Sequence, residues 1–288
     1  MFEQNNIMKI TDKIHLVKHT FFVPVSPEKS LERFVFSLIV FGEKITLIDS
    51  GVKGSHEKIF SYIGEHGRDV QEISTLILTH SHPDHIGSAA VIREQTGCNI
   101  LAHKGEKEWM EDINIQNQQR PVPGFFSLAD RSVIIDEFVN DGDIFLKDTD
   151  TEFRFIHTPG HSKGLLSIFF PAQKILFTAD AVPLKDDIPN YDDYTELVAS
   201  ILKIKQNRQA ECLLSSWAEP ACGKKRMREL INSGEAYIKK LHEAVLTYYS
   251  GADRNNFDNC RNLISGLGLP PVYANPLAHR AFLSHFRD

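Results

Sequence analysis

Apolar runs separated by glycine and charged turns divide the first half of the chain into predicted strands and helices. Period-two or continuous apolar patterns of strand length predict five strands. They cover residues 13–19, 33–42, 43–48, 74–79 and 99–102. Ser55 is a residue type that caps helices, and the pattern after it predicts a helix to about Glu65. A second helix should end before Gly97.

The second half repeats the order of strands followed by helix. Strands are predicted over residues 152–157, 165–170, 174–178 and 212–216, with a helix over 191–206. From Gly223 onward only helical periodicity is visible. Both halves place polar residues of metal-binding types at strand ends, which suggests two similar halves stacked sheet on sheet with helices outside. Long parallel strand–helix–strand alternation is absent, so a doubly wound or barrel fold is disfavoured.

Two segments depart from this order. Residues 104–131 combine a short helix carrying Trp109 with a stretch rich in Gln, Asn, Pro and Phe. A segment this long within one domain is commonly a lid or a substrate wall. We therefore expect a core domain over residues 1–222, with 104–131 as a lid, and a helical extension over 223–288. That extension should pack on the core and cover the pocket, or else form a homodimer contact.

Composition narrows the class of protein. The chain has 288 residues, of which 42% are hydrophobic and 24% charged, as expected of a soluble globular protein. A net charge of −6 argues against nucleic-acid binding. No apolar run is long enough for a membrane span, and the N-terminus lacks the pattern of a secretory signal. We thus expect a small-molecule substrate and neither a nucleic-acid nor a membrane partner.

The number and spacing of the cysteines bear on the cellular compartment of the protein. There are four, they are widely spaced, and they form no C-x-x-C pair: Cys98, Cys212, Cys222 and Cys260. In a chain of this length such cysteines are expected to be reduced thiols, not a disulfide framework. The sequence therefore predicts a cytosolic protein.

The most informative segment is 79–85, which reads THSHPDH. It places His80, His82 and His85 together with Asp84 at the corner between a predicted strand and a predicted helix. Imidazole and carboxylate groups are preferred ligands of catalytic divalent metals. Such crowding would be unfavourable without a cation. The segment therefore predicts a metal site.

The second half supplies candidate ligands of its own. Residues 158–161 form a Thr-Pro-Gly-His sequence whose proline and glycine favour a tight turn that presents His161. The apolar strand 174–179 ends in Asp180. In combination with the histidine cluster, Asp180 is interpreted as a bridging ligand.

These motifs resemble those of the metallo-β-lactamase-fold superfamily over roughly residues 10–220. The resemblance lies in Asp49 of the sequence LIDSG, the H-x-H-x-D-H pattern at 80–85, His161 in TPGH and Asp180 in FTAD. It implies an α+β fold, a four-layer αββα sandwich with a metal centre at one sheet edge. It further implies that His80, His82 and His161 hold one ion, and that Asp84 and His85 hold a second with Asp180 bridging. Asp49 would orient a ligand by hydrogen bonding.

The chain departs from the family at one motif. A further histidine usually follows the last core strand, where this chain reads LSSWAEP over 214–220. The second site is then weak, completed by water, or completed by Glu219, His279 or His285. One or two ions are therefore expected, with zinc preferred and iron or manganese as alternatives.

The expected chemistry is hydrolysis. A metal-bound hydroxide would attack the substrate, with Asp84 handling the proton. The similarity to the glyoxalase-II-like branch favours an ester or thioester substrate. Two alternatives stay open: a persulfide-type dioxygenase with a single iron, and a metal-binding protein with little catalysis.

Overall fold

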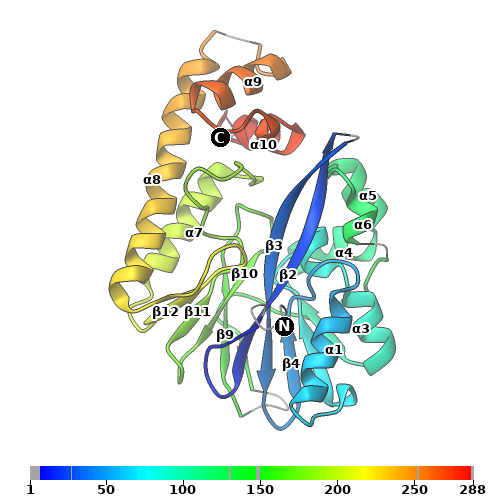
Figure 1. Cartoon of the computed structure of the whole chain (residues 1–288). Helices are drawn as coiled ribbons and strands as arrows, with labels where there is room; N and C mark the ends of the chain where they lie inside the picture. Colours follow the sequence, from blue (N-terminus) through cyan, green and yellow to red (C-terminus); the bar gives the residue numbers. More distant parts are fainter. Residues whose placement is uncertain (1–6, 27, 130, 147–149, 252, 287–288) are drawn as a thin grey trace.

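Two β-sheets lie face to face with helices on both outer sides in the computed structural model, which describes residues 7–26, 28–129, 131–146, 150–251 and 253–286 (Figure 1). The first sheet has seven strands in the order β1-β2-β3-β4-β5-β6-β7. These are β1 (Ile7–Lys9), β2 (Ile14–Ser26), β3 (Lys29–Phe41), β4 (Ile45–Ile48), β5 (Ile73–Ile77), β6 (Asn99–Ala102) and β7 (Glu137–Phe138). Pairing is antiparallel from β1 to β4 and parallel from β4 to β7.

The second sheet has six strands in the order β13-β12-β11-β10-β9-β8. They are β8 (Ile144–Phe145), β9 (Phe153–His157), β10 (Leu166–Phe170), β11 (Ile175–Phe177), β12 (Cys212–Leu214) and β13 (Ala221–Cys222). Only β11 and β12 pair in parallel; the other neighbours are antiparallel.

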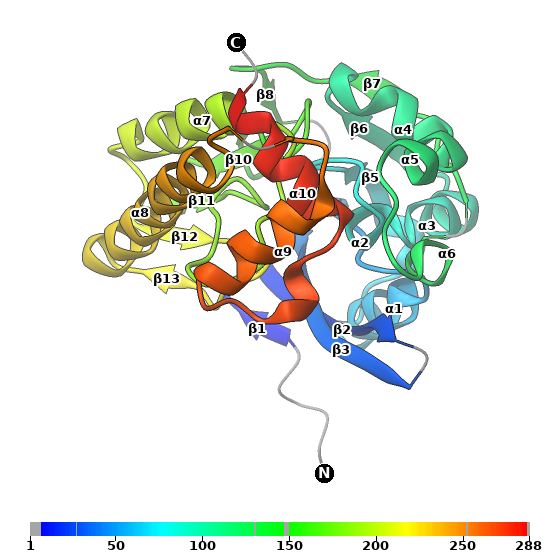
Figure 2. The same cartoon turned by 90° about the horizontal axis from the view of Figure 1, so that it is seen from above.

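Helices cover the outer face of each sheet (Figures 1 and 2). On the first sheet they are α1 (Ser55–Glu65), α3 (Ala89–Thr96), α4 (Lys107–Glu111), α5 (Ile113–Gln119) and α6 (Phe125–Leu128), with the short α2 (Pro83–Ile86) at the sheet edge. On the second they are α7 (Tyr194–Gln206) and α8 (Lys224–Tyr248). The helices α9 (Phe257–Gly266) and α10 (Pro276–Leu283) stack at the far end of α8. Single 3₁₀ turns are η2 (Val70–Glu72), η3 (Lys104–Glu106), η4 (Pro271–Tyr273) and η5 (Ser284–Phe286).

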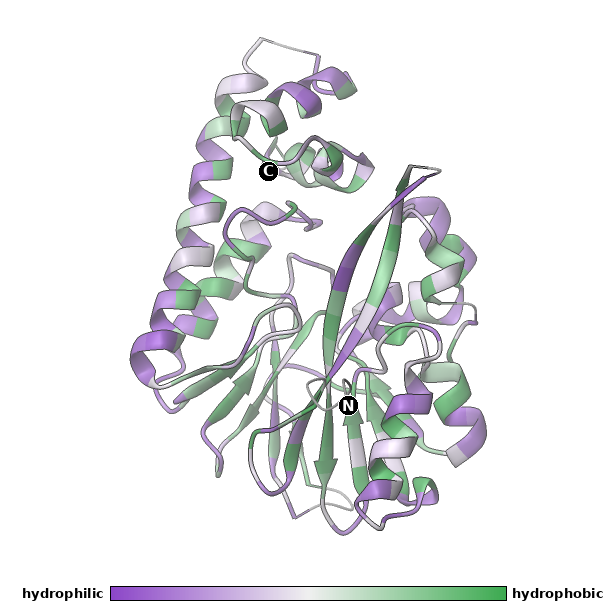
Figure 3. Cartoon of the chain, in the orientation of Figure 1, coloured by the Kyte–Doolittle hydropathy of each residue, from purple (hydrophilic) through white to green (hydrophobic). Residues whose placement is uncertain are grey.

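Alternating side chains explain why the sheets stack in this way. Along β2, Leu16 points to a core between the two sheets, where it packs with residues such as Phe155. Its neighbour Val17 points to an outer core shared with Ile59 and Ile63 of α1. Figure 3 shows the apolar residues concentrated in the strands, with polar residues on the outward faces of the helices. The four-layer αββα architecture is confirmed.

The predicted strand over residues 99–102 matches the structure residue for residue. The helix predicted to run to about Glu65 is α1, but Ser55 is its first residue and not its cap, which is Gly54. The helix expected to end before Gly97 is instead two helices, interrupted at Gly87. Gly87 donates from its backbone nitrogen to the carbonyl oxygen of Gly51 at 2.9 Å. A Cβ atom here would lie 2.2 Å from the carbonyl oxygen of Leu128, so the break brings two backbones into close contact. The two-residue strands β7, β8 and β13 were not predicted, because such short segments carry no periodic signal.

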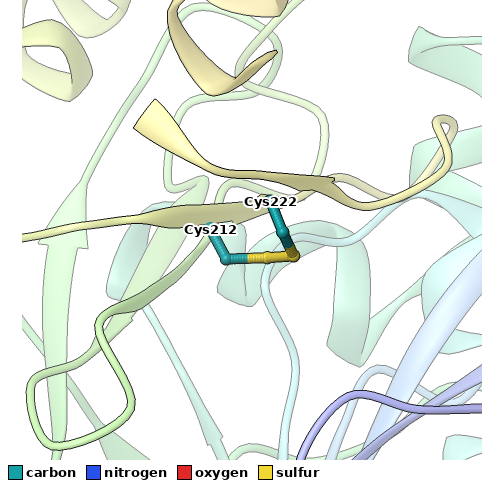
Figure 4. The surroundings of a disulfide bond; sticks show 2 residues. All are labelled: Cys212 and Cys222. Carbon is teal, nitrogen blue, oxygen red and sulfur yellow. A yellow bond between two sulfur atoms is a disulfide. The ribbon is translucent and has the colours of Figure 1, made fainter. Parts of the chain in front are cut away.

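The prediction that all four cysteines are reduced thiols was wrong for one pair. Cys212 of β12 and Cys222 of β13 lie opposite each other in the sheet and form a disulfide (Figure 4). Strand β13 was not predicted, and without it nothing in the sequence brings these two residues together. Cys98 and Cys260 are free and buried. The cytosolic location rested on reduced thiols, so it loses that support and stays a prediction.

Among the residues that the structure describes, no helix is both long enough and apolar enough to cross a membrane.

Candidate metal centre

The histidine-rich segment is held between the two sheets where strand β5 ends. The backbone nitrogen of Leu78 donates to Leu101 at 2.8 Å in the first sheet, and Thr79 accepts from the backbone nitrogen of Leu166 in the second at 3.0 Å. Helix α2 then begins with Pro83, a residue suited to the first helical position because its missing N–H would be unsatisfied there anyway. The segment is thus fixed by both halves of the chain.

Three imidazoles from both halves of the chain converge. Nδ1 of His82 lies 3.0 Å from Nε2 of His80 and 2.8 Å from Nε2 of His161. All three side chains are buried, and one ring nitrogen of each lies within 4.8 Å of the others. His80 and His82 are two positions apart, and the turn at 158–161 brings His161 to the same point.

A second group of donors adjoins the first and shares His80 with it. His80, His85 and Asp180 offer ligand atoms within 4.8 Å of one another. Nε2 of His85 lies 3.3 Å from Oδ1 of Asp180 and 3.5 Å from Oδ2 of Asp84. Oδ2 of Asp180 is 3.2 Å from Nε2 of His161. Asp180 therefore lies between the two groups, and its role as a bridging ligand stays a prediction.

Asp49 lies beneath the cluster and orients His85. Its Oδ2 atom is 2.8 Å from Nδ1 of His85, and its Oδ1 atom accepts a hydrogen bond from the backbone nitrogen of Thr79 at 2.8 Å. The hydroxyl of Thr79 also donates to this carboxylate. Asp49 has a φ of 59°, in the left-handed region that Asp tolerates better than most residues. These contacts direct Nε2 of His85 toward Asp84 and Asp180.

His161 is oriented by a loop that follows β11. Its Nδ1 atom lies 2.7 Å from the carbonyl oxygen of Asn190, which leaves Nε2 facing His82. The preceding Gly160 has a φ of 120°, and a Cβ atom there would lie 2.2 Å from the backbone nitrogen of Leu197 in α7. The turn therefore requires glycine both for its backbone conformation and for the approach of α7.

Burial sets the charge of the imidazoles. It lowers the pKa of both His80 and His82 well below the ordinary value, so both rings are neutral near pH 7 and have a lone pair to offer a metal. Burial by itself would lower the pKa of His85 as well. The carboxylates of Asp180, Asp49 and Asp84 outweigh this effect and hold the pKa of His85 well above its usual range.

The two carboxylates facing His85 respond differently to burial. Burial alone would raise the pKa of Asp180, yet His85 and His161 hold it well below the ordinary value. Burial raises the pKa of Asp84 because its partners offset desolvation only partly. Asp180 is therefore a buried anion with fixed partners, whereas Asp84, with 13% of its side chain exposed, reaches the open side of the cluster.

The donor set fits a divalent metal ion. Nε2 of His85 and Oδ1 of Asp180 are buried, face each other, and make no hydrogen bond within the described part of the chain. Three converging imidazole nitrogens would repel one another through their lone pairs, unless a proton or a cation lies among them. Three histidines suit a catalytic zinc site, and a mixed histidine and carboxylate group suits zinc, iron or manganese.

Trp217 belongs to the segment over residues 214–220, which lacks a histidine, and it contacts the cluster. Its indole nitrogen donates to Oδ2 of Asp180 at 2.7 Å. None of the three residues considered as replacements reaches the cluster. Glu219 is exposed and lies near Lys18, while His279 and His285 make their contacts within the C-terminal helices and with Tyr191.

Glu106 is buried and links the two ligand-bearing loops by hydrogen bonds, a role that was not predicted from the sequence. One of its carboxylate oxygens accepts from the backbone nitrogen of Ser81 at 3.0 Å and from the Ser81 hydroxyl. The other accepts from the Ser162 hydroxyl at 2.7 Å and the Gly164 nitrogen at 2.5 Å. A lone glutamate in a polar stretch carries no motif, so only its burial reveals this role.

A cavity of about 370 Å³ opens beside the cluster. His82, Asp84, His161 and Asp180 form one end of it. The segment predicted to be a lid contributes Arg120, Val122, Pro123 and Leu128. Trp109, Phe125 and Phe126 of the same segment are not among its lining residues. The C-terminal region contributes residues 272–275 and Leu277, so both segments border the candidate site.

Comparison with known families agrees with this geometry. The family described as the Metallo-beta-lactamase superfamily matches residues 32–215, which is more than half of the chain. The chain belongs to the metallo-β-lactamase superfamily. Its relatives within this superfamily include hydrolases.

Two curated relatives illustrate the similarity within the superfamily. The hydroxyacylglutathione hydrolase GloC of Haemophilus influenzae is 31% identical over 172 residues, which cover 57% of this chain and 76% of that protein. The probable metallo-hydrolase YqgX of Bacillus subtilis is 28% identical over 162 residues, covering 56% of this chain and 69% of that protein.

Solved structures support the fold. A metallo-beta-lactamase family protein of Thermus thermophilus superposes with a TM-score of 0.67 at 18% identity, covering 92% of both chains. A beta-lactamase domain protein of Burkholderia ambifaria gives a TM-score of 0.70 at 15% identity, covering 97% of this chain and 86% of that one. At these identities the similarity concerns the fold alone.

Proposed function

We propose that this protein hydrolyses an ester or thioester, with a divalent metal held by His80, His82 and His161. A second ion would be held by Asp84, His85 and Asp180. The observation that carries the proposal is the convergence of these side chains from both halves of the chain at the end of one cavity. The similarity to a relative named as a hydroxyacylglutathione hydrolase favours a thioester.

The reaction consumes one water molecule. In a thioester, a bond forms between the water oxygen and the carbonyl carbon, and the carbon–sulfur bond breaks. One proton goes to the departing thiolate, so the products are a carboxylic acid and a thiol. A bound divalent ion would lower the pKa of coordinated water and polarise the carbonyl oxygen. We propose zinc, because three histidines are its frequent catalytic ligand set.

The chain's own residues position and transfer the proton. Asp84 lines the cavity, so its carboxylate is placed to accept a proton from the attacking water and return it to the leaving group. Asp180 is fixed by Trp217 and His161, which leaves its Oδ1 atom directed at His85. Asp49 keeps Nε2 of His85 turned toward the same point.

The test combines a metal panel with a matched pair of variants. Protein loaded with Zn²⁺ or Mn²⁺ should cleave a generic thioester, and His82→Ala should lose at least about a hundredfold in kcat/KM, since removal of a ligand costs more than loss of its hydrogen-bond partner. His66→Ala is the control, because His66 is exposed and lies outside the cluster. Equal turnover by the wild type and His82→Ala would overturn the proposal. Iron as the sole bound metal, with oxygen uptake and no hydrolysis, would favour the persulfide dioxygenase instead.

A further inference from the structure

The cavity beside the candidate metal centre is apolar away from its ligand end. Besides the segment over residues 120–128, its walls come from four separate parts of the chain: the β2–β3 hairpin, the loop between β11 and α7, helix α8 and the C-terminal segment. Figure 1 shows the hairpin and the C-terminal helices rising at the same end of the molecule. Aliphatic residues from all four parts line the cavity, namely Val23, Leu31, Val182, Ile188, Ile238 and Leu277.

The charges in these walls already have partners. Arg33 and Arg120 are the only lysine or arginine side chains lining the cavity among the described residues. Arg33 donates two hydrogen bonds to the two carboxylate oxygens of Asp187, each at 2.8 Å. Arg120 is only 2% exposed, and its Nη2 atom donates to Oδ1 of Asn190. Arg33 would have to give up Asp187 to receive a charged substrate group. The buried Nε atom of Arg120 makes no hydrogen bond within the described part of the chain, but it lies 3.9 Å from Oδ1 of Asp192, which offsets its charge.

Two tyrosine hydroxyl groups that line the cavity also make hydrogen bonds within the protein. Tyr273 donates to Oδ1 of Asp187 at 3.2 Å, and Tyr237 donates to the carbonyl oxygen of Asp187 at 2.6 Å. The guanidinium of Arg33 also stacks over the ring of Trp217 at 4.6 Å. Arg33, Asp187, Tyr237 and Tyr273 thus form one hydrogen-bonded network. Most of the other residues that line the cavity away from the candidate ligands are apolar.

We propose that the part of the substrate seated in this cavity is an uncharged, apolar acyl chain of medium length. This inference rests on the proposed hydrolysis at the metal centre and names the substrate class. The carbonyl group of the substrate would lie beside Asp84 and Asp180, and its acyl chain would extend toward Ile238 and Leu277. Burying methylene groups against these walls is favourable. A glutathione conjugate carries two carboxylates and an ammonium group, which these walls would leave desolvated and unpaired.

The binding test does not depend on turnover. Uncharged alkyl carboxamides of rising length, from acetamide to decanamide, are titrated into the metal-loaded protein by calorimetry. Affinity should rise about fourfold for each added methylene until the cavity is full. An affinity that is flat or falls with length would overturn the proposal, whether or not any thioester is cleaved.

The kinetic test uses acyl thioesters of N-acetylcysteamine, a small neutral thiol, with chains from acetyl to decanoyl. The ratio kcat/KM should rise with acyl length and exceed the value for S-lactoylglutathione. Acetyl thioesters of long alkyl thiols form the second arm, which tests whether the chain enters from the thiol side. Preference for lactoylglutathione, or for long thiols over long acyl groups, would overturn the assignment of an acyl chain while leaving hydrolysis itself intact.

Variants that fill part of the cavity test where the acyl chain of the substrate lies. Ala274 lines the cavity, is half-buried and packs at the margin of a core cluster, so Ala274→Trp would fill cavity space, and its unfolding free energy is measured alongside to establish that it folds. This variant should lower the ratio of decanamide to acetamide affinity by at least about tenfold, which corresponds to roughly two methylenes. Leu246→Trp is the matched control, because Leu246 is 45% exposed on α8 and does not line the cavity. An unchanged ratio in Ala274→Trp would overturn the placement of the chain.

Discussion

The indole nitrogen of Trp217 donates a hydrogen bond to Oδ2 of Asp180 at 2.7 Å. Asp180 is the carboxylate that lies between the two groups of candidate ligands, so this bond occupies one of its two oxygens. A tryptophan N–H can only donate and cannot bind a metal. The second group therefore has a hydrogen-bond donor where a further ligand would complete it, and the two metal sites should be unequal.

Trp217→His should add a second tightly bound zinc ion per chain, because an imidazole there offers a lone pair beside Asp180. Trp217→Phe is the control: it also removes the N–H but supplies no ligand. Metal content after gel filtration and calorimetric titration with Zn²⁺ would measure the number of ions. If both variants bind the same number as the wild type, Trp217 does not limit the second site.

Glu106 should determine how well the ligand loops are aligned. Glu106→Gln keeps the size of the side chain but leaves one oxygen for donors on Ser81, Ser162 and Gly164. We expect zinc affinity to fall about 10–100-fold, as for other partners of metal ligands. We also expect the unfolding free energy of the metal-free protein to fall by about 1–3 kcal/mol.

The control for this prediction is Glu108→Gln, since Glu108 is exposed two residues away. Zinc titration and urea unfolding would measure both effects. An affinity and a stability that stay at the wild-type values in Glu106→Gln would show that the loops are aligned without this carboxylate.

The C-terminal region should lose stability in mild acid through His285. Burial, helped by the neighbouring His242, lowers the pKa of His285 from 6.5 to about 3. Between these values the unfolded chain binds a proton that the folded chain does not, so stability rises with pH. The contribution is complete above about pH 6.5 and is lost progressively as the pH falls toward 3. At pH 5 it amounts to a loss of about 2 kcal/mol.

Urea unfolding at pH 7.5 and at pH 5 would measure this loss. His285→Gln cannot titrate, so its stability should depend less on pH than that of the wild type, although loss of the contact with Tyr191 destabilises it at both values. Parallel pH profiles for the two proteins would contradict the assignment.

The disulfide predicts the number of reactive thiols. Oxidised protein unfolded without reductant should show two free thiols, from Cys98 and Cys260, and four after reduction. Cys222→Ser should lower the unfolding free energy by about 2–3 kcal/mol, because the bond closes a loop with a sequence separation of 10. Thiol titration and peptide mapping would check the pairing. Four reactive thiols before reduction would exclude the disulfide.

Much of the fold and most of the candidate ligands could be predicted from the sequence, because their signals are local. His80 and His82 are two positions apart, so any extended segment points both the same way. His161 follows a Pro-Gly turn, and Asp180 ends an apolar strand. Apolar periodicity likewise located the helix after Ser55 and parts of the strands β2 and β3, since burial of one face is a property of each segment by itself. It did not predict the hairpin end of these strands, residues 20–26 and 29–32.

Tertiary structure alone decided how distant segments meet. Three contacts depend on side chains brought together from different elements. They are the hydrogen bond from Trp217 to Asp180, the hydrogen bonds of Glu106 to two loops, and the disulfide between Cys212 and Cys222. The same holds for the cavity, whose walls come from several separate parts of the chain. A sequence states which groups are available, but hydrogen bonds and packing act over a few ångström in space, so only the folded chain determines which groups become partners.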